Sequence, residues 1–550
     1  MSIDRRRALA LLGLGAAGPA MAAPAKAGAV RFKHGVASGD PRQDRVILWT
    51  RITPEHTGGD VAYTWRLNPI DRRAGGAKSG AGVTGPARDY TVKVDVAGLD
   101  PGRAYTFEFE SGGVKSPMGR TRTLPAGPTQ DVVIAYASCA LYPNGYFNAY
   151  QAMADLPRVD LMIHLGDYIY EYGGPKSYGA NSPVGAERPH DPPHELLSLA
   201  DYRRRHAQYK TDPGLQAAHA RAPWIVAWDD HETANDSYKD GAENHQPDKE
   251  GDWNARKAVA LKAYYEWMPI REPVKGESLA EACHRSFRIG DLATLIMLET
   301  RLTARTRQLT YDRDLMVDGK PDAEAFKAKW NDPQHRMMSP AQEAWFGREL
   351  ETSVKAGQTW QVVGSGVVMG RLKPPNPGRD FTPEMMARMG DDVKKRVVRM
   401  QPVADLGLPY GLDMWDGYPA DRERVYDRFK IAKARPIVIS GDSHAFWANE
   451  LADAEGRHVA CEFGGTAITS PGADEAFGFA VGPYFVKTSP EVKFCDQGAR
   501  GFVLLTLSHK EARADLMAVS SITSKTFKAS VLKSYRITPE GTGPSKLREV

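Results

Sequence analysis

Four apolar runs in this 550-residue chain end abruptly in side chains that could bind a metal ion. The runs are DVVIAYASC at 131–139, VDLMIHLGD at 159–167, PWIVAWDDHE at 223–232 and RPIVISGDSH at 435–444. Such runs are typical of strands that are buried on both faces of a sheet. In open α/β sheets the ligand lies beyond the carboxyl ends of the strands. We therefore expect the polar residues that end these runs to meet at one edge.

Each ending has an ordinary structural explanation when it is taken alone. A single Asp after a strand is most often a helix cap or a turn residue, and a Cys in that place is usually a small hydrophobic residue. Here, however, the endings recur in four runs: Cys139; Asp167 with Tyr170; Asp229, Asp230, His231 and Glu232; Asp442 with His444. This conjunction predicts one shared polar site.

A cleft that gathers several carboxylates repels its own charge unless cations compensate it. Divalent or trivalent metal ions are the simplest solution, and an Asp carboxylate can bridge two of them. Two ions about 3.5 to 4 Å apart can clamp phosphoryl oxygens and generate a hydroxide nucleophile near neutral pH. His231 directly follows the candidate ligand Asp230. It would be free to act as the catalytic acid on the leaving oxygen or as a donor to the phosphate.

The pattern of apolar and turn residues also changes along the chain. Residues 28–125 alternate short β-rich runs with Asp-Pro, Pro-Gly and Gly-Gly turns, which predicts a small all-β sandwich of the immunoglobulin or fibronectin kind. Residues 123–130 read as a linker. From 131 to 530, apolar runs alternate with helical patterns and predict an α/β domain, and residues 531–550 are expected to form a C-terminal tail.

Two helices are well signalled within the α/β part. One covers 252–268; the other begins at Ser339, a candidate N-cap, with Pro340 in the first turn and Gln342 completing a capping box. Its apolar positions fall near one face: Trp345, Phe346, Leu350 and Val354. The segment 303–338, with scattered charges and few apolar runs, is expected to consist of long connecting loops.

The first 22 residues have the pattern of a secretory signal peptide. Arginines at 5–7 precede an apolar run at 8–17, which is shorter than the ~20 residues of a membrane span. Ala20 and Ala22 supply the small residues that a signal peptidase needs. The paired arginines resemble a twin-arginine signal, although Asp4 departs from that pattern. We expect export through the twin-arginine (Tat) machinery, a periplasmic or secreted location and no transmembrane segment after signal removal.

Composition narrows the possible partners. The net charge of +4 is small, and no concentrated basic patch predicts a nucleic-acid-binding face. Four cysteines, at 139, 283, 461 and 495, are too few for a disulfide scaffold. One pair could still form a bridge, and the sequence leaves open which.

Taken together, the GDxxY, DDHE and GDSH motifs resemble the metallophosphoesterase signature, and the chain is similar to the alkaline phosphatase D (PhoD) family. The matching stretches run through nearly the whole mature chain: residues 32–52, 137–154, 164–173, 228–238, 264–271, 439–451 and 462–472. The resemblance implies an α/β (α+β) metallophosphoesterase domain, with a two-sheet β core flanked by helices, after the small sandwich.

The resemblance also implies a ligand set for Fe(III) and Ca²⁺. On the iron side it implies Cys139, Asp167 and Tyr170, with Asp167 shared with calcium. On the calcium side it implies Asp230 and Asn235, and it completes the shells with Asp442 and His444. Anionic thiolate, phenolate and carboxylate suit trivalent iron, and carboxylate and carbonyl oxygens suit Ca²⁺. Where the family has Leu-Asp-Thr-Arg this chain has Glu299 before Thr300 and Arg301, and we expect Arg301 to form a strand-end salt bridge.

Three functions compete at this point. The first is an exported, metal-dependent alkaline phosphatase that hydrolyses small phosphate monoesters and also diesters, by attack of a metal-bound hydroxide. The second is a phosphodiesterase or phospholipase D-like hydrolase on the same site, because a two-metal clamp does not distinguish a monoester from a diester. The third is a non-catalytic surface binding protein that works through its N-terminal sandwich.

Overall fold

The computed structural model describes residues 29–70, 75–174, 178–179, 181–274, 276–541 and 543–550. The expected signal peptide, residues 1–22, lies outside these ranges. Within them, no helix combines the length and the apolar character needed to cross a membrane.

A ten-stranded sheet carries three of the four apolar runs. In sheet order its strands are β28 (Arg548–Glu549), β25 (Ala529–Ile537), β24 (Ala512–Val519), β23 (Arg500–Ser508), β11 (Asp131–Ala137), β12 (Leu161–His164), β13 (Trp224–Val226), β2 (Val36–Gly39), β3 (Arg45–Arg51) and β7 (Thr91–Ala97). The neighbours β11, β12 and β13 are parallel, so their carboxyl ends lie at the same edge.

A seven-stranded sheet carries the fourth run. Its strands, in order, are β14 (Arg285–Ile289), β15 (Ala293–Met297), β18 (Trp360–Ser365), β19 (Pro436–Ser440), β21 (His458–Gly464), β20 (Phe446–Ala452) and β22 (Val492–Asp496). The path from β15 through β18 and β19 to β21 is parallel. β19 therefore delivers the residues that follow it to the same region as β12 does.

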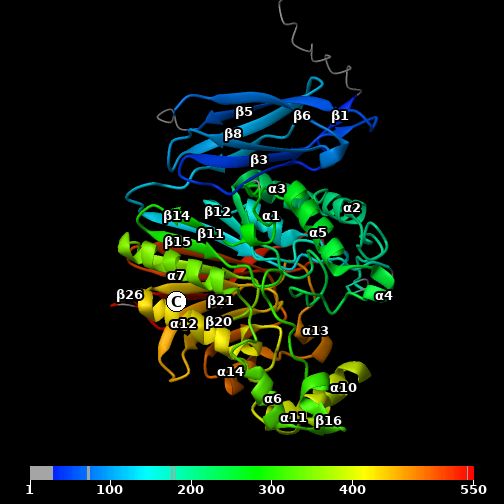
Figure 1. Ribbon diagram of the computed structural model, residues 1–550, viewed down its shortest axis with the longest axis vertical. Helices are drawn as coiled ribbons and strands as arrows, with labels where there is room; N and C mark the ends of the chain where they lie inside the picture. Colours follow the sequence, from blue (N-terminus) through cyan, green and yellow to red (C-terminus); the bar gives the residue numbers. More distant parts are fainter. Residues whose placement is uncertain (1–28, 71–74, 175–177, 180, 275, 542) are drawn as a thin grey trace, which may run out of the picture.

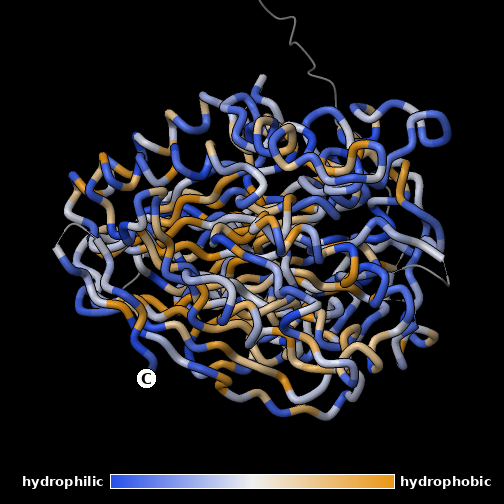
Figure 2. The backbone as a smooth tube through the Cα atoms, turned by 90° about the horizontal axis from the view of Figure 1, so that it is seen from below, coloured by the Kyte–Doolittle hydropathy of each residue, from blue (hydrophilic) through white to orange (hydrophobic). Residues whose placement is uncertain are grey.

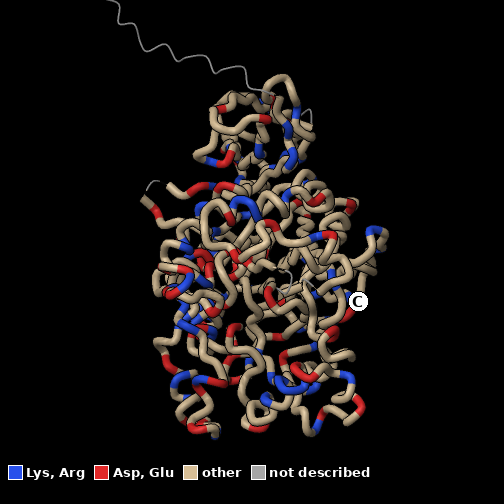
Figure 3. The backbone as a smooth tube through the Cα atoms, turned by 90° about the vertical axis from the view of Figure 1, so that its right-hand side faces the viewer, with Lys and Arg blue, Asp and Glu red and all other residues tan. Residues whose placement is uncertain are grey.

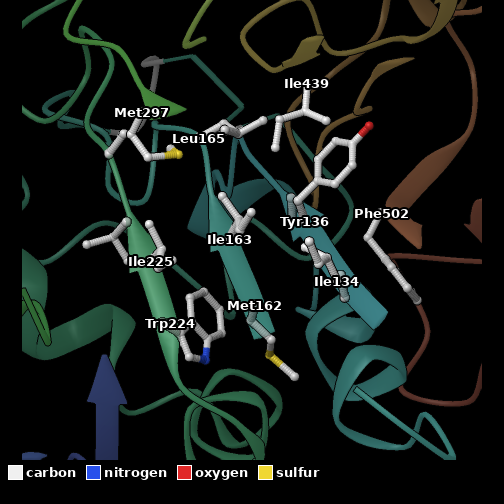
Figure 4. Close-up of a cluster of buried hydrophobic side chains, with 14 of the residues drawn as sticks. Ile134, Tyr136, Met162, Ile163, Leu165, Trp224, Ile225, Met297, Ile439 and Phe502 are labelled. Carbon is white, nitrogen blue, oxygen red and sulfur yellow. The ribbon is translucent and has the colours of Figure 1, made fainter. Parts of the chain in front are cut away.

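The two sheets face each other across one hydrophobic core. Ile134 and Ile163 of the first sheet lie in the same buried cluster as Ile439 and Met297 of the second (Figure 4). The hydroxyl of Tyr136 donates to the carbonyl of Phe463 at 2.8 Å and joins the sheets directly. Figure 2 shows the hydrophobic segments concentrated inside the molecule and hydrophilic segments around them. The mixed α/β architecture with several sheets agrees with the predicted class.

Helices cover the outer faces of this core (Figure 1). On the side of the ten-stranded sheet lie α1 (Asn148–Ala154), α2 (Leu199–Tyr209), α3 (Pro213–Arg221) and α5 (Trp253–Trp267). On the side of the seven-stranded sheet lie α7 (Pro340–Lys355) and α12 (Pro419–Ala432). Short helices below them, in the view of Figure 1, include α9 (Pro383–Arg388), α10 (Asp391–Arg399), α11 (Gln401–Asp405), α13 (Ala473–Phe477) and α14 (Gly482–Thr488).

The N-terminal β segment has its own core but shares a sheet with the rest of the chain. A separate sheet contains β10 (Gly119–Arg122), β8 (Ala104–Ser111), β5 (Val61–Pro69) and β6 (Lys78–Thr84), with β9 (Val114–Lys115) on β8. It packs through Phe107 and Phe109 against Leu48 and Val92. However, β2 pairs with β13 where Gly39 lies opposite Trp224. The expected boundary at 125–131 therefore separates two cores without separating the ten-stranded sheet.

The two predicted helices are present, and one predicted detail of the second is wrong. Asp252 caps α5, and the Ser339 hydroxyl caps α7 by accepting from Gln342 N at 3.0 Å. The side chain of Gln342 does not complete a capping box. It hydrogen-bonds instead to the backbone N and O of Glu299, each at 2.8 Å, because α7 packs against the end of β15.

Two expectations of unstructured segments are also wrong. Residues 303–338 contain α6 (Ala323–Trp330), which buries Phe326, and a short hairpin of β16 (Met316–Val317) and β17 (Lys320–Pro321). The expected tail at 531–550 contributes most of β25, which pairs with β24 and buries Tyr535 and Ile537. In both cases the apolar partner comes from a distant part of the chain.

Charge and cysteine usage can also be read from the structure. Lys and Arg are interspersed with Asp and Glu along the backbone (Figure 3). The four cysteines, at 139, 283, 461 and 495, are all free and buried.

Candidate metal centre

The loops that follow four strands, three of the ten-stranded sheet and one of the seven-stranded sheet, meet at one place. Cys139 follows β11, Asp167 follows β12, Asp230 follows β13 and Asp442 follows β19. Backbone hydrogen bonds tie the first two loops together, because the amides of Cys139 and Ala140 donate to the carbonyls of Gly166 and Asp167.

Ligand-type atoms from these loops form three overlapping groups, within each of which all atoms lie within 4.8 Å of one another. The first group is Cys139, Asp167 and His444; the second is Asp167, Asp230 and His231; the third is Asp167, Asp229, Asp230 and Asp442. Asp167 belongs to all three groups. Its carboxylate therefore lies where the three groups overlap.

Tyr170 lies on the thiol side of this centre. Its hydroxyl is 3.1 Å from Asp167 Oδ2, 2.7 Å from Ser470 Oγ and 3.4 Å from His444 Nε2. Its ring packs on the ring of His231, with the centroids 4.2 Å apart. Burial, and then the charge of Asp167, raise the pKa values of both the Tyr170 phenol and the Cys139 thiol. Their ionised forms therefore need a nearby cation.

The loop backbone is strained where it presents these side chains. Cys139, Asp167, Asp442 and His444 adopt φ values of 61°, 57°, 63° and 55°, in the left-handed region. Non-glycine residues rarely adopt this conformation, and it concentrates at functional sites. Gly166 has φ 117°, and a Cβ on it would lie 2.4 Å from the Cβ of Asp229. The glycine lets the two ligand-bearing loops approach each other.

Arg301 balances part of the charge on the opposite, carboxylate side. It is fully buried and binds Asp229 through Nε and Nη2 at 2.7 and 2.8 Å, and Asp413 through Nη1 at 2.7 Å. Asp442 and Asp230 lie 3.8 and 4.0 Å from Nη2. The predicted salt bridge of Arg301 is therefore confirmed, and it reaches into the metal-binding groups.

His231 is held by a carboxylate that sequence reasoning missed. Its Nδ1 lies 2.7 Å from Oε2 of Glu171, which is buried. Burial lowers the pKa of His231, but the charges of Asp230, Glu171 and Asp167 outweigh burial and hold that pKa well above its usual value. The ring is thus held as a proton donor next to Asp167 and Asp230, with which it shares one of the three groups.

Asn235 lies at the margin of the centre. Its backbone N donates to Glu171 Oε1 at 2.7 Å, and its side-chain amide donates to Glu243 at 3.2 Å. The next residue, Asp236, donates its backbone N to Asp230 Oδ2 at 2.6 Å. The Asn235 loop is therefore attached to the centre through two carboxylates.

Other contributors became visible only in the structure. Glu232 accepts from the amides of Asp167, Tyr168 and Asp229, and so fixes the turns of two ligand loops. Glu232 was already named from the sequence as the last residue of DDHE, without a role, and Glu171 directly follows Tyr170, which was the available signal. Asp413 carried no signal, because it is 112 residues from its partner Arg301.

The residues present suit bound cations. Asp167 Oδ1 is buried and has no hydrogen-bond partner among the described residues. Burial raises the pKa values of both Asp167 and Asp442, and the neighbouring carboxylates add to the rise. Ionising these groups together requires positive charge beyond that of Arg301. The donor set has a thiol, a phenol and an imidazole on one side and carboxylates on the other, and all of these groups can bind metal ions.

Comparisons with known proteins agree with this geometry. The family model described as PhoD-like phosphatase matches residues 134–516, and the model described as PhoD-like phosphatase, N-terminal domain, matches residues 18–125. The chain is 33% identical over 532 residues to alkaline phosphatase D of Bacillus subtilis (strain 168), covering 94% of this chain and 82% of that protein. A solved structure of PhoD aligns with a TM-score of 0.75 at 31% identity, covering 94% of this chain and 92% of that one.

Proposed function

The chain belongs to the PhoD-like phosphatase family and is a phosphoric ester hydrolase; we propose that it is an exported alkaline phosphatase that uses Fe(III) and Ca²⁺ to hydrolyse small phosphate monoesters and diesters. The observation that carries the metal assignment is the place of Asp167 in all three ligand groups. One carboxylate shared between a thiol-phenol side and an acidic side is what a mixed two-metal centre requires.

Under this proposal the two sides hold different ions. Cys139, Tyr170 and His444, with Asp167, would hold iron; Asp230, Asp442 and the Asn235 loop, again with Asp167, would hold calcium. When bound, the ions supply charge to stabilise the phosphoryl oxygens and to activate the attacking water. Asp229 also belongs to the acidic group, and its pairing with Arg301 makes it a neighbour of the proposed calcium side.

The residues of the chain supply orientation and a proton. His231 is the proposed catalytic acid, which gives its proton to the leaving oxygen as the ester bond breaks. The Tyr170 ring packed against it limits its rotation. Glu232 holds the loops of Asp167 and Asp229 by three backbone hydrogen bonds, so that the ligands keep their spacing during turnover.

Two finer expectations remain part of the proposal. The first is export by the twin-arginine route, which rests on the pattern of residues 1–22. The second is the immunoglobulin or fibronectin character of the N-terminal layers, which rests on short antiparallel strands around a core of their own. Fusion of residues 1–30 to a reporter that is active only after folded export tests the first of these.

The metal and substrate assignments are tested together on the exported protein. Elemental analysis should find iron and calcium, the visible spectrum should show a tyrosinate-to-iron band, and calcium chelation should abolish activity. Turnover of a monoester, a diester and a phospholipid should show that the monoester is accepted. A preference of several orders of magnitude for the diester or the phospholipid would favour the phosphodiesterase or phospholipase D-like alternative.

Asp167→Asn provides the matching variant. It should lose both metals and reduce kcat/KM by at least about 10³-fold, because bridging and charge compensation are lost together. Asp421→Asn is the control, since Asp421 is also buried but binds the backbone amides of Met337 and Met338. The control should keep its metals. Full activity of Asp167→Asn, or of colourless, calcium-free protein, contradicts the proposal.

A further inference from the structure

Glu171 divides its two carboxylate oxygens between two different parts of the site. Oε2 lies 2.7 Å from His231 Nδ1. Oε1 accepts from the backbone N of Asn235 at 2.7 Å and from the side-chain amide of Asn244 at 2.8 Å. Asn244 N also donates to the carbonyl of Asn235 at 3.2 Å, which closes the loop on itself. Glu171 is fully buried, so water does not compete for these bonds.

The chemistry of the partners fixes the direction of every bond. An ionised carboxylate can only accept hydrogen bonds, so the proton between Glu171 and His231 belongs to Nδ1. Among the described residues, Nδ1 is the ring nitrogen of His231 with a hydrogen-bond partner. Nε2 is therefore the nitrogen left to act on a substrate. On the other oxygen, both partners are N–H groups that can only donate.

We propose that Glu171 is a positioning residue with two arms: Oε2 orients His231 for proton donation from Nε2, and Oε1 holds the loop 235–244 against the centre. This inference rests on the proposed role of His231 as the acid. It connects the acid and the loop that carries Asn235 through a single side chain, which lies next to Tyr170 in the chain.

Glu171→Gln separates the two arms because the two donors on Oε1 fix the orientation of the new amide. The amide oxygen must replace Oε1 to keep the bonds from Asn235 and Asn244. The NH₂ group then faces His231 and donates where Glu171 accepted, so Nδ1 must give up its proton. This variant keeps the hydrogen bonds from Asn235 and Asn244. It reverses the direction of the hydrogen bond with His231 Nδ1.

The leaving group of the substrate reports on the histidine arm. An alkyl phosphate has a poor leaving group that needs a proton, whereas p-nitrophenyl phosphate has a good one that does not. We expect Glu171→Gln to lower kcat/KM for an alkyl phosphate by about 10²-fold or more, within the range of general acid catalysis. The loss for p-nitrophenyl phosphate should stay below about 10-fold, with unchanged metal content. Adding Glu171→Gln to His231→Ala should cause no further loss.

A control exists in another histidine–glutamate pair, in which His245 is buried and Glu250 is half-buried. Glu250 Oε2 lies 3.4 Å from His245 Nδ1, outside the ligand groups. Glu250→Gln makes the same chemical change and should not alter the ratio of the two substrates. Glu171→Asp keeps the charge but withdraws it by one methylene, and should show a weaker form of the same selectivity. It serves as the second variant if Glu171→Gln folds poorly.

The loop arm is tested by Asn244→Ala, which removes one donor from Oε1 and leaves Oε2 in place. This variant should bind added Ca²⁺ more weakly, by about 10-fold or more as for other supporting partners of metal ligands, without changing the substrate ratio. Equal losses on both substrates in Glu171→Gln, or loss of its metals, overturn the inference. A failure of His231→Ala itself to discriminate between the substrates overturns the proposed acid instead.

Discussion

Two buried polar clusters of opposite chemistry lie a few residues apart along the chain. The acidic cluster is Asp167, Asp229, Asp230 and Asp442, beyond the strand ends. The imidazole cluster is His164, His206 and His219 with Lys210, between the helices α2 and α3 and the ten-stranded sheet. Lys210 Nζ donates to the hydroxyl of Tyr168 at 2.9 Å and lies 3.2 Å from His219 Nε2.

Burial favours the neutral form of the side chains in both clusters. Only the imidazole cluster becomes neutral near pH 7 without binding further protons or cations. Burial lowers the pKa values of His164 and His206 to about 3 and lowers that of Lys210 well below its usual value. The imidazoles are therefore neutral near pH 7. Burial raises the pKa values of Asp167 and Asp442, so the carboxylates must bind either protons or cations. The acidic cluster therefore needs added positive charge at neutral pH, whereas the imidazole cluster does not.

The largest expected effect concerns Arg301, the buried guanidinium that pairs with Asp229 of the acidic cluster. Arg301→Met leaves Asp229 buried without its partner, which should cost about 3 to 5 kcal/mol of unfolding free energy in metal-free protein. Added divalent metal should recover more stability in the variant than in the wild type, because a bound cation replaces the lost charge. Denaturant unfolding with and without EDTA measures both quantities.

Arg422→Met is the matched control for this experiment. Arg422 is also buried and binds Asp416 at 2.6 Å, away from the ligand groups. Its loss should destabilise the protein to a similar degree, with no extra recovery on adding metal. If added metal restored the same stability in both variants, Arg301 and the metals would not compensate the same negative charge.

The next effect compares Tyr170, which contacts the acidic cluster, with Tyr168, which contacts the imidazole cluster. Tyr170→Phe should abolish the tyrosinate-to-iron band and lower kcat/KM by at least about 10-fold, as expected for loss of an interaction that supports a metal site. The fold should persist, because the ring still packs on His231. Tyr168→Phe removes a hydroxyl that contacts Lys210 and His219, and should keep the band. A visible spectrum and an activity assay separate the two variants, and a band that survives Tyr170→Phe rules out this phenol as the ligand.

The smallest effect is a change in pH dependence. The pKa of His206 is about 3 in the folded state and ~6.5 in the unfolded state. Between these two pH values the unfolded state therefore binds a proton that the folded state does not bind. The stabilising contribution is present above pH ~6.5 and is lost as the pH falls toward 3. His206→Phe keeps a ring beside Trp267 and should make the slope of stability against pH shallower by about 1.4 kcal/mol per pH unit.

The measurement is the unfolding free energy of wild type and variant between pH 4 and 6.5, in metal-free protein. The acidic cluster contributes with the opposite sign, since carboxylates with raised pKa values lose stability as the pH rises. That contribution is common to both proteins and cancels in the difference. Parallel curves would mean that His206 takes up its proton equally in the folded and unfolded states.

Much of the centre could be predicted from short stretches of sequence. The apolar runs predicted buried strands, and their endings named Cys139, Asp167, Asp230, Asp442 and His444, which the structure brings together. This worked because hydrophobic periodicity and turn residues are local properties, and because parallel strands place their carboxyl ends at one edge. Whether each residue binds the proposed ion stays a prediction.

Long-range pairing could not be predicted in this way. Gln342 had the spacing of a capping box, but the end of β15 offered it two backbone partners 43 residues away. Residues 531–537 resembled a tail until β24 provided an edge to pair with. In each case the local pattern was compatible with several outcomes, and a partner outside the segment selected one.

The sequence by itself determined which chemical groups this protein could bring to a site: a thiol, a phenol, carboxylates and imidazoles at the ends of buried strands. Only the tertiary structure decided how their charges are balanced, through Arg301 against Asp229 and Asp413 and through Glu171 against His231. The physical reason is that ligand type is a property of single residues. Charge compensation in a buried site depends on distances of a few ångströms between residues 60 to more than 100 positions apart.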